Sequence, residues 1–372
     1  MPKTIAITPS WYWPQGVPRV IGIPRYTLPE LCVDRPARLQ PDELALTDGE
    51  SHLSAADLKE AVDAAAASFS AGQAVELSGA PAIDNVINLF AALRADAHIL
   101  FEGARAASPD AGSVDMRRPV VTIPGPRGDV KHSHRSLLAA GLALTTFFET
   151  EPGRPWLVSL PLWRWEGLVS LLSPLLRRAP AVLASPEGDP EDIVALISRE
   201  NVGLAFDDLD AVMRWTRESK KAVKNSRRVL DSFLLSVSGM FDPDARRRVS
   251  RAFECPALTV YGTPETAAIF ASHASWYLDE SVGLGVTNMH IIPADPRTGE
   301  PIQALWELVE SAEVTVYSPS LFCADESAAD RFAGNRYRTG VSASSDANGM
   351  MYMLGAGDPE WGSARGRPPS AG

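Results

Sequence analysis

The chain has 372 residues, of which 45% are hydrophobic and 22% are charged, an ordinary composition for a globular protein of two or three structural units. Its formal net charge of -11 argues against a general nucleic-acid binder. No apolar run approaches the roughly 20 residues that a membrane helix needs, so we expect no membrane span. The three cysteines are widely spaced and odd in number, which indicates reduced thiols in a cytoplasmic protein rather than a disulfide framework or a metal site.

Composition divides the chain into four parts. Residues 1–24 are rich in proline and aromatic residues, and we expect an irregular arm that packs on the rest, because clustered rings rarely stay in water. Residues 25–285 alternate between strand and helix patterns. Residues 286–355 have the pattern of β-hairpins, and the Gly/Pro-rich residues 356–372 are expected to be a disordered tail.

The first predicted helix begins at a capping box formed by Ser54 and Asp57. Residues 74–77 and 98–101 have the apolar pattern of short strands, and residues 83–94 between them have helical spacing. A strand, a helix and a strand in this order form a βαβ unit, which predicts a parallel sheet.

The same alternation continues along the chain. Further strands are expected over 119–122, 156–160, 181–184, 202–206, 234–239 and 257–262, and further helices after His134, over 167–177 and over 190–200. Asp207, Asp208 and Asp210 follow one of these strands, and we expect them to cap the next helix. The pattern predicts an α/β fold.

A Pro/Gly-rich loop follows the strand expected at 119–122. In "TIPGPRGDVKHSHRS" (122–136) a β-like run enters the loop and a helix-like run leaves it, which is the layout of a nucleotide-binding loop. The residues alone leave open whether the loop holds phosphate or only keeps the shape of such a loop.

Four stretches in chain order resemble the adenylate-forming superfamily, which includes acyl- and aryl-CoA synthetases and peptide-synthetase adenylation domains. They are the opening segment from Tyr26, "SLPLWRWEGL" (159–168), "VYGTPETA" (260–267) and "GNRYRTGVSASSDANGMMYMLG" (334–355). The resemblance implies the N-terminal domain of such an enzyme, with two abutting mixed or parallel sheets flanked by helices and a β-rich end. It also implies that the family's small C-terminal domain and its catalytic lysine are absent.

The resemblance places the loop at the family's site for the ATP phosphates, where Ser/Thr hydroxyls, backbone N–H groups and a lysine hold the nucleotide. Here the hydroxyls are mostly replaced by apolar residues, and the two prolines of the loop have no N–H to donate. The remnant consists of Gly125, Arg127, Gly128 and Lys131, with Gly128 at the lysine position and Lys131 out of register. Either Arg127 attracts an anion, or the loop is purely structural.

The other nucleotide motifs have also lost polar groups. Pro264 replaces a threonine that contacts the adenylate phosphate, and Val341 replaces the aspartate that binds both ribose hydroxyls, a loss of roughly 1.5–3 kcal/mol. Tyr261, Gly262 and Glu265 are retained, and in the family the glutamate is a Mg²⁺ ligand. We therefore expect binding of ATP and Mg²⁺ to be lost or weakened.

The resemblance also implies an acyl or aryl pocket. The residues that fall in it are Trp163, Arg164, Trp165, Ser238, Met240, Tyr261 and His273. Trp163 and Trp165 share a face of an extended chain, so they line a cavity or pack in the core. Arg164 pairs either with a ligand carboxylate or with Glu166 at the surface.

Other chemistry has less support in the sequence. The six histidines have no metal spacing, and His132 and His134 are candidates for a general base or for a helix-entry or surface role. Basic clusters around Lys220 and Arg246 either dock CoA phosphate or an acidic carrier protein, or form a solvated helix face.

The leading hypothesis is a repurposed ligase-like protein without ordinary ATP-dependent ligation. It would bind an acyl or aryl acid, or its thioester on CoA or on the phosphopantetheine of a carrier protein, within a biosynthetic pathway. The first alternative is an ATP-dependent ligase completed by a C-terminal domain on another polypeptide. The second is a non-catalytic scaffold subunit that partners an active ligase.

Overall fold

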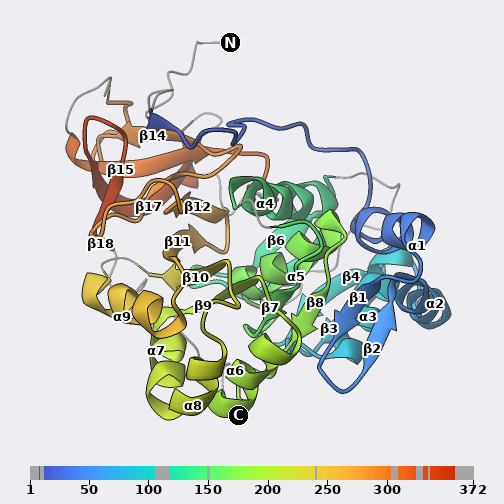
Figure 1. The fold of residues 1–372 in the computed structure, drawn as a ribbon. Coiled ribbons are helices and arrows are strands. Elements are labelled where there is room, and N and C mark those ends of the chain that lie inside the picture. The colour runs from blue at the N-terminus through green and yellow to red at the C-terminus, as the bar shows by residue number, and fades with distance from the viewer. Residues whose placement is uncertain are drawn as a thin grey trace.

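A computed structural model describes residue 8 and residues 12–104, 117–148, 151–238, 241–302, 309–323, 330–333 and 336–356. The strands form sheets of nine, four and five strands, and helices lie between and around them (Figure 1). The expected α/β class with parallel and mixed sheets is confirmed.

The nine-stranded sheet is the centre of the molecule. From edge to edge its strands are β13 (Leu284–Gly285), β12 (Ala267–Ala271), β11 (Ala257–Thr263), β10 (Ser232–Val237), β9 (Leu204–Asp208), β7 (Trp156–Val158), β8 (Ala181–Leu183), β1 (Leu44–Thr47) and β2 (His52–Ser54). The strands from β11 to β1 run parallel, and the others are antiparallel additions at the two edges. The central strands are buried on both faces, which explains their continuous apolar sequences.

The four-stranded sheet precedes most of the large sheet in the chain. It consists of β3 (Ala74–Leu77), β4 (His98–Phe101), β5 (Pro119–Ile123) and β6 (Val130–Ser133). The first three strands are parallel, as the βαβ pattern predicts, and β6 returns antiparallel to β5.

Helices cover the sheets on both sides. They are α1 (Arg35–Leu39), which continues a π-helical turn (Glu30–Asp34), α2 (Ala55–Ala66), α3 (Ile83–Arg94), α4 (His134–Phe147), α5 (Trp165–Arg177), α6 (Pro190–Arg199), α7 (Leu209–Glu218), α8 (Lys220–Asn225) and α9 (Pro243–Phe253). Helices α4 and α5 pack against each other in a core shared by the large and four-stranded sheets. Helices α6 to α9 enclose a second core against the large sheet.

The last part of the described chain is an antiparallel sheet. Its strands are β14 (His290–Ala294), β15 (Val309–Tyr317), β16 (Phe332–Ala333), β17 (Arg336–Ser345) and β18 (Met351–Ala356). Strand β17 alternates strictly between buried and half-buried residues, so one face of this sheet packs on a third core.

Residues 12–24 lie along the body of the molecule, from the β-rich sheet toward α1 (Figure 1). The Trp13 ring packs edge-on against Phe147, with the centroids 5.8 Å apart. The Asn288 N–H donates a hydrogen bond to the Arg19 carbonyl oxygen at 2.8 Å. These contacts agree with an arm that packs on the rest, while the expected tail lies almost entirely outside the described residues.

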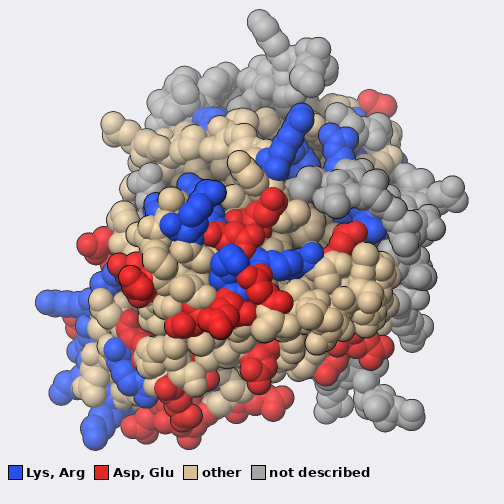
Figure 2. Space-filling view, turned by 90° about the vertical axis from the view of Figure 1, so that its right-hand side faces the viewer, with Lys and Arg blue, Asp and Glu red and all other residues tan. Residues whose placement is uncertain are grey.

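Acidic and basic side chains are mixed on the face that Figure 2 shows, and the acidic ones spread over its middle and lower parts. This face therefore does not offer the continuous basic surface that a polyanion needs. Among the described residues, no helix has the length and apolar character to cross a membrane.

Candidate functional site

The predicted nucleotide loop is the turn of a hairpin between β5 and β6. The Gly128 N–H donates to the Gly125 carbonyl oxygen at 3.2 Å, and Lys131 lies on β6 itself. Helix α4 begins only after β6, where the Ser133 hydroxyl accepts a hydrogen bond from the Ser136 N–H. The helix N-terminus, whose N–H groups could bind phosphate, is therefore separated from the loop by a whole strand.

Arg127 extends from this hairpin to strand β17. Its Nη2 donates to the Thr339 carbonyl oxygen at 2.8 Å and to the Tyr337 hydroxyl at 3.3 Å. A Cβ on Gly340 would lie only 3.3 Å from Arg127 Nη1, so the glycine leaves room for the guanidinium. This side chain thus links the loop to the β-rich sheet.

Glu265 follows β11 and lies buried beside Arg127. Its Oε1 is 3.7 Å from Arg127 Nε and 3.7 Å from Arg331 Nη1, and its side chain is 1% exposed. Neither carboxylate oxygen accepts a hydrogen bond from the described part of the chain. Arg331 Nη2 also donates to the Arg127 carbonyl oxygen at 3.1 Å. The carboxylate is thus compensated by two guanidinium charges of the same chain.

Two tyrosines line this cluster. Burial raises the pKa of Tyr337, and the negative charge of Glu265 raises it further. Burial and the charge of Glu265 also raise the pKa of Tyr261. Both phenols are therefore neutral at physiological pH and keep their hydroxyl protons.

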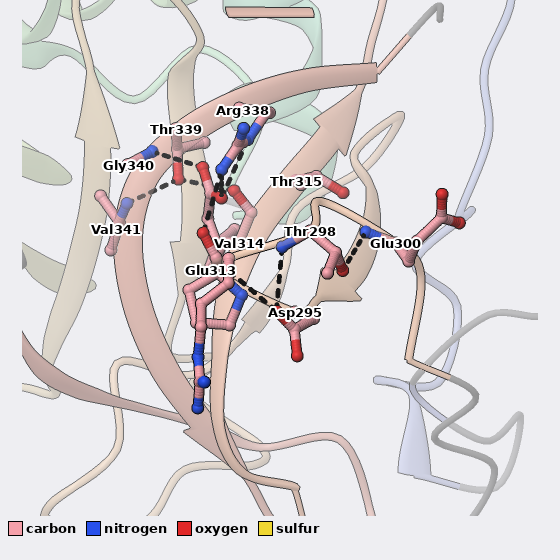
Figure 3. A network of polar contacts seen from close by, with 12 residues as sticks. Asp295, Thr298, Glu300, Glu313, Val314, Thr315, Arg338, Thr339, Gly340 and Val341 are labelled. Carbon is pink, nitrogen blue, oxygen red and sulfur yellow. Dashed lines mark hydrogen bonds and ion pairs between the residues drawn. The ribbon is translucent and has the colours of Figure 1, made fainter. Parts of the chain in front are cut away.

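Val341 belongs to the core of the β-rich sheet. It is 1% exposed and packs in the same cluster as Tyr337. Figure 3 shows how its strand is held: the Val341 N–H donates to the Thr339 hydroxyl at 3.2 Å, and the Gly340 N–H donates to Glu313 at 3.2 Å. The side chain to which the resemblance assigns ribose binding is thus apolar and enclosed.

The histidines near the loop are buried and bonded to backbone atoms. His132 Nε2 bonds to the Pro264 carbonyl oxygen at 2.8 Å, and His134 Nδ1 accepts the Leu28 N–H at 3.2 Å. Burial lowers the pKa of both to about 4, so they are neutral at pH 7. Neither histidine therefore has a surface role, and His134 stands at the helix entry, as the first residue of α4. Among the described residues, His, Cys, Asp and Glu side chains do not gather in a set of three that could hold a metal.

A second charge cluster lies at the carboxyl edge of the nine-stranded sheet. Arg164 precedes α5, where its Nη2 donates to Glu166 Oε1 at 2.8 Å and its Nη1 donates to Asp208 Oδ2 at 2.5 Å. The Ser236 hydroxyl on β10 donates to Glu166 at 2.9 Å. Burial alone would lower the pKa of Arg164, but Glu166 and Asp208 outweigh burial and raise it. Arg164 does pair with Glu166, which was one of the two alternatives. The pair does not lie at the surface, however, because the Glu166 side chain is only 8% exposed.

Asp207 completes this second cluster. The Ser159 hydroxyl donates to its Oδ2, and the Asp208 N–H donates to its Oδ1 at 2.6 Å. Burial raises the pKa of Asp207 to about 7. Asp208 occupies the N-cap position of α7 and Asp210 lies in its first turn, as expected. Neither Asp207 nor Asp208 caps the helix through its side chain, however, because both carboxylates bond inward.

The two tryptophans of the predicted pocket pack in different places. Helix α5 begins at Trp165, so the two residues do not lie on one extended segment and their side chains do not share a face. A Cβ on Gly79 would come within 2.1 Å of the Trp163 ring. A Cβ on Gly262 would come within 2.8 Å of the Trp165 ring, which also lies edge-on to Phe206 at 5.9 Å. Two glycines therefore make room for two rings that face different parts of the fold.

The remaining residues of the predicted pocket are scattered. Ser238 is exposed after β10, and Tyr261 is buried on β11. Met240 lies outside the described residues. His273 follows β12, which runs antiparallel to β11 and carries the chain away from the edge where Glu265 lies. The structure therefore does not bring His273 to the other predicted pocket residues.

Several solved structures are similar to this chain. The o-succinylbenzoate CoA synthetase MenE from Bacillus subtilis, in complex with the acyl-adenylate intermediate OSB-AMP, has a TM-score of 0.74 and 16% identity over 88% of this chain and 78% of MenE. The N-terminal domain of FACL13 from Mycobacterium tuberculosis has a TM-score of 0.76 and 12% identity over 89% of this chain and all of that domain (100%). ATP-bound MatB from Rhodopseudomonas palustris has a TM-score of 0.74 and 16% identity over 89% of this chain and 79% of MatB. The chain has the adenylate-forming fold. No protein-family model matches it, and no curated protein matches it by sequence.

The adenylate-forming fold brings three of the predicted motifs together. Arg127 comes from the loop, Glu265 from "VYGTPETA" and Tyr337 and Gly340 from the last block, and all four meet in one cluster. At these sequence identities the likeness establishes the fold alone. The chemistry depends on this chain's own side chains.

Arg331, Asp207 and Asp208 are among the cluster residues that were not predicted as site residues. Arg331 belongs to no recognisable sequence block, so the sequence holds no signal for it. Asp207 and Asp208 end the buried parallel strand β9, at the edge where ligands bind in α/β sheets. That signal could have placed them near Arg164.

Proposed function

We propose that this chain binds an acyl or aryl compound as its thioester and does not activate acids with ATP. The observation that carries the proposal is the Arg127 guanidinium, which lies between Glu265 and the Thr339 carbonyl oxygen. The class of ligand is suggested by a structure with the same fold, MenE bound with its product analogue OSB-NCoA.

Mg²⁺ does not fit the carboxylate that the resemblance assigns to it. Glu265 Oε1 faces two guanidinium groups at 3.7 Å, so a divalent cation there would lie beside two positive charges. Mg²⁺ also requires near-octahedral oxygen coordination, which a buried carboxylate between two arginines cannot offer. Arg127 and Arg331 supply the positive charge that the ion would bring.

ATP does not fit the three motifs that the resemblance assigns to it. Pro124 and Pro126 lack N–H donors, and Pro264 lacks a hydroxyl. Val341 is enclosed in a core and accepts nothing from a ribose. The guanidinium of Arg127 is already bonded to β17, so binding of a triphosphate would first have to break contacts within the protein.

The second charge cluster favours a thioester over a free acid. Glu166, Asp207 and Asp208 bring three carboxyl groups to one guanidinium, that of Arg164, which already bonds two of them. A carboxylate ligand would meet excess negative charge here, whereas the acyl end of a thioester is uncharged. CoA and the phosphopantetheine of a carrier protein are both consistent with this chemistry.

The test is a binding panel with the purified chain. Melting temperature and calorimetric heat are measured with acyl- and aryl-CoA thioesters, with the matching free acids and with ATP·Mg²⁺. We expect at least one thioester to bind and to raise the melting temperature, since a ligand at about 100 times its Kd adds about 2.7 kcal/mol of stability. The free acids should give no shift at the same concentration.

A pair of variants locates the binding. Trp163→Leu should weaken thioester binding, while Tyr317→Leu, which changes an exposed ring on β15, should leave it unchanged. Release of pyrophosphate by the chain alone, with ATP and a free acid, would show that it is a ligase and overturn the proposal. If neither thioesters nor acids bind, the scaffold hypothesis replaces it.

A further inference from the structure

A surface cavity of about 200 Å³ lies apart from both charge clusters. It is formed by the turn that follows β12, by the N-terminal arm and by the residue before β18. Its lining includes Tyr12, Trp276, Tyr277, Leu278 and Met350. Because β12 leads away from Glu265, this cavity is independent of the function proposed above.

The walls of the cavity are aromatic and exposed. The rings of Tyr12 and Trp276 stand nearly perpendicular, with an interplanar angle of 80° and centroids 4.3 Å apart. Trp276, Tyr277 and Leu278 are 39%, 43% and 42% exposed, so three consecutive large apolar side chains face solvent together. Such a patch on a folded protein is a candidate for ligand contact.

The turn that carries these rings is held in place by the backbone. The Trp276 N–H donates to the His273 carbonyl oxygen at 2.9 Å, and the Ser275 N–H donates to His273 Nδ1 at 3.2 Å. On the opposite side, Tyr12 belongs to the arm and directly precedes Trp13, whose ring packs on Phe147. The cavity is therefore preformed, which lowers the entropic cost of binding.

Two aromatic rings in this region make cation–π contacts with arginine side chains. The Arg246 guanidinium lies over the Tyr277 ring at 4.6 Å, and the Arg19 guanidinium lies over the Trp13 ring at 4.7 Å. The negative faces of such rings attract cations. Arg246 and Arg247 share Asp279, and Arg247 also pairs with Asp244, so two carboxylates compensate the two positive charges.

Carboxylates border the cavity as well. Asp346 Oδ1 accepts the N–H of Met350, which lines the cavity, at 2.9 Å, so the aspartate is fixed next to it. Its charge is close enough to raise the pKa of Tyr12, after the larger effect of burial. Glu280 is exposed and does not line the cavity, but it lies near Tyr352, because Asp346, Tyr12 and Glu280 all raise the pKa of Tyr352 after the larger effect of burial. Perpendicular rings bordered by negative charge complement a cation that is itself partly apolar.

We infer that this cavity binds an organic ammonium group, with the methylated nitrogen against the Tyr12 and Trp276 rings, which contact each other edge to face, and with its charge offset by Asp346 and Glu280. An uncharged group of the same shape could use only the apolar contacts. The preference for the cation over its uncharged isostere is therefore the property that identifies the site.

The experiment compares choline with 3,3-dimethyl-1-butanol, which replaces the nitrogen by carbon at the same shape. Both are titrated into the full chain by calorimetry and by NMR. Choline should bind saturably, about tenfold more tightly than the alcohol. Equal affinities, or no saturable binding of choline, would overturn the inference.

Variants assign the binding to the cavity. Glu280→Gln, which alters only an exposed side chain, should weaken choline but not the alcohol, and Trp276→Leu should abolish choline binding. Tyr26→Leu changes another exposed ring, 52% exposed, and should leave both affinities unchanged. If Trp276→Leu binds choline like Tyr26→Leu, while the melting temperatures match the wild type, the cavity is not the site.

Discussion

At the scale of single residues, two buried carboxylates are stabilised in different ways. Glu265 lies between two guanidinium groups of the same chain, whereas Asp207 receives hydrogen bonds from a neutral hydroxyl and a backbone N–H. The charge of Arg164 acts on Asp207, but burial outweighs it and raises the pKa of this aspartate to about 7. Asp207 is therefore the group whose protonation couples most directly to folding in the second cluster.

Asp207→Asn should change how stability depends on pH. The ordinary pKa of 3.8 lies below the folded value of about 7, so between these values the folded protein holds a proton that the unfolded chain has released. The contribution of Asp207 to stability is full at low pH and is lost as pH rises through this window. We expect the free energy of unfolding of the variant, relative to wild type, to rise by about 2–4 kcal/mol from pH 4 to pH 8.

Urea unfolding at several pH values measures this difference. Burial lowers the pKa of His132 and His134 to about 4, so the protein loses stability as pH falls below the ordinary histidine pKa. The wild type and the variant both contain these histidines, so this effect cancels in the difference between them. Asp42→Asn, at an exposed position, is the matched control and should show no such trend. A difference between Asp207→Asn and wild type that is constant or falling with pH would contradict the assignment.

At the scale of elements, the capping box of α2 is the clearest local signal that became structure. The Asp57 N–H donates to the Ser54 hydroxyl at 3.1 Å, and the Ser54 N–H donates to Asp57 Oδ2 at 3.0 Å. Ser54→Ala removes the side-chain acceptor and should cost about 0.5–2 kcal/mol in the free energy of unfolding. Ser51→Ala, on the preceding turn, should cost less than about 0.5 kcal/mol. Equal costs in chemical denaturation would mean that the cap is not formed in solution.

Elements with strong local patterns were predicted almost to the residue. Strands β3 and β4 and helix α3 have the expected bounds, because their apolar periodicity is set within each segment. Strand β6 was missed, because its four residues, "VKHS", are short and mixed in polarity. Its presence changes the interpretation of the loop, since it moves the N-terminus of α4 away from the phosphate position.

The candidate sites are formed by contacts between residues far apart in the sequence, which local sequence patterns do not reveal. Asp208 looks like a helix cap in the sequence because it precedes a helix, and its bond to Arg164 spans 44 residues. The pairing of Arg127 with Glu265 joins residues 138 positions apart through the packing of the hairpin on the large sheet. Sequence reasoning identified both residues as remnants, but only the fold brings them together.

At the scale of the whole molecule, the adenylate-forming fold keeps its sheets and cores while the clusters at their edges carry this chain's own chemistry. Residues of three motifs meet in one cluster, and the guanidinium groups of Arg127 and Arg331 lie beside Glu265, to which the resemblance assigns a metal. The proposed loss of ATP chemistry thus rests on a few side chains rather than on a different architecture.

Calorimetric titration of ATP·Mg²⁺ into the purified chain tests the central claim most directly. We expect no saturable heat up to about 1 mM nucleotide, because Arg127 and Val341 lie where the resemblance assigns phosphate and ribose binding. One-to-one binding with a Kd in the range of about 1–100 μM, abolished by Glu265→Gln, would contradict it.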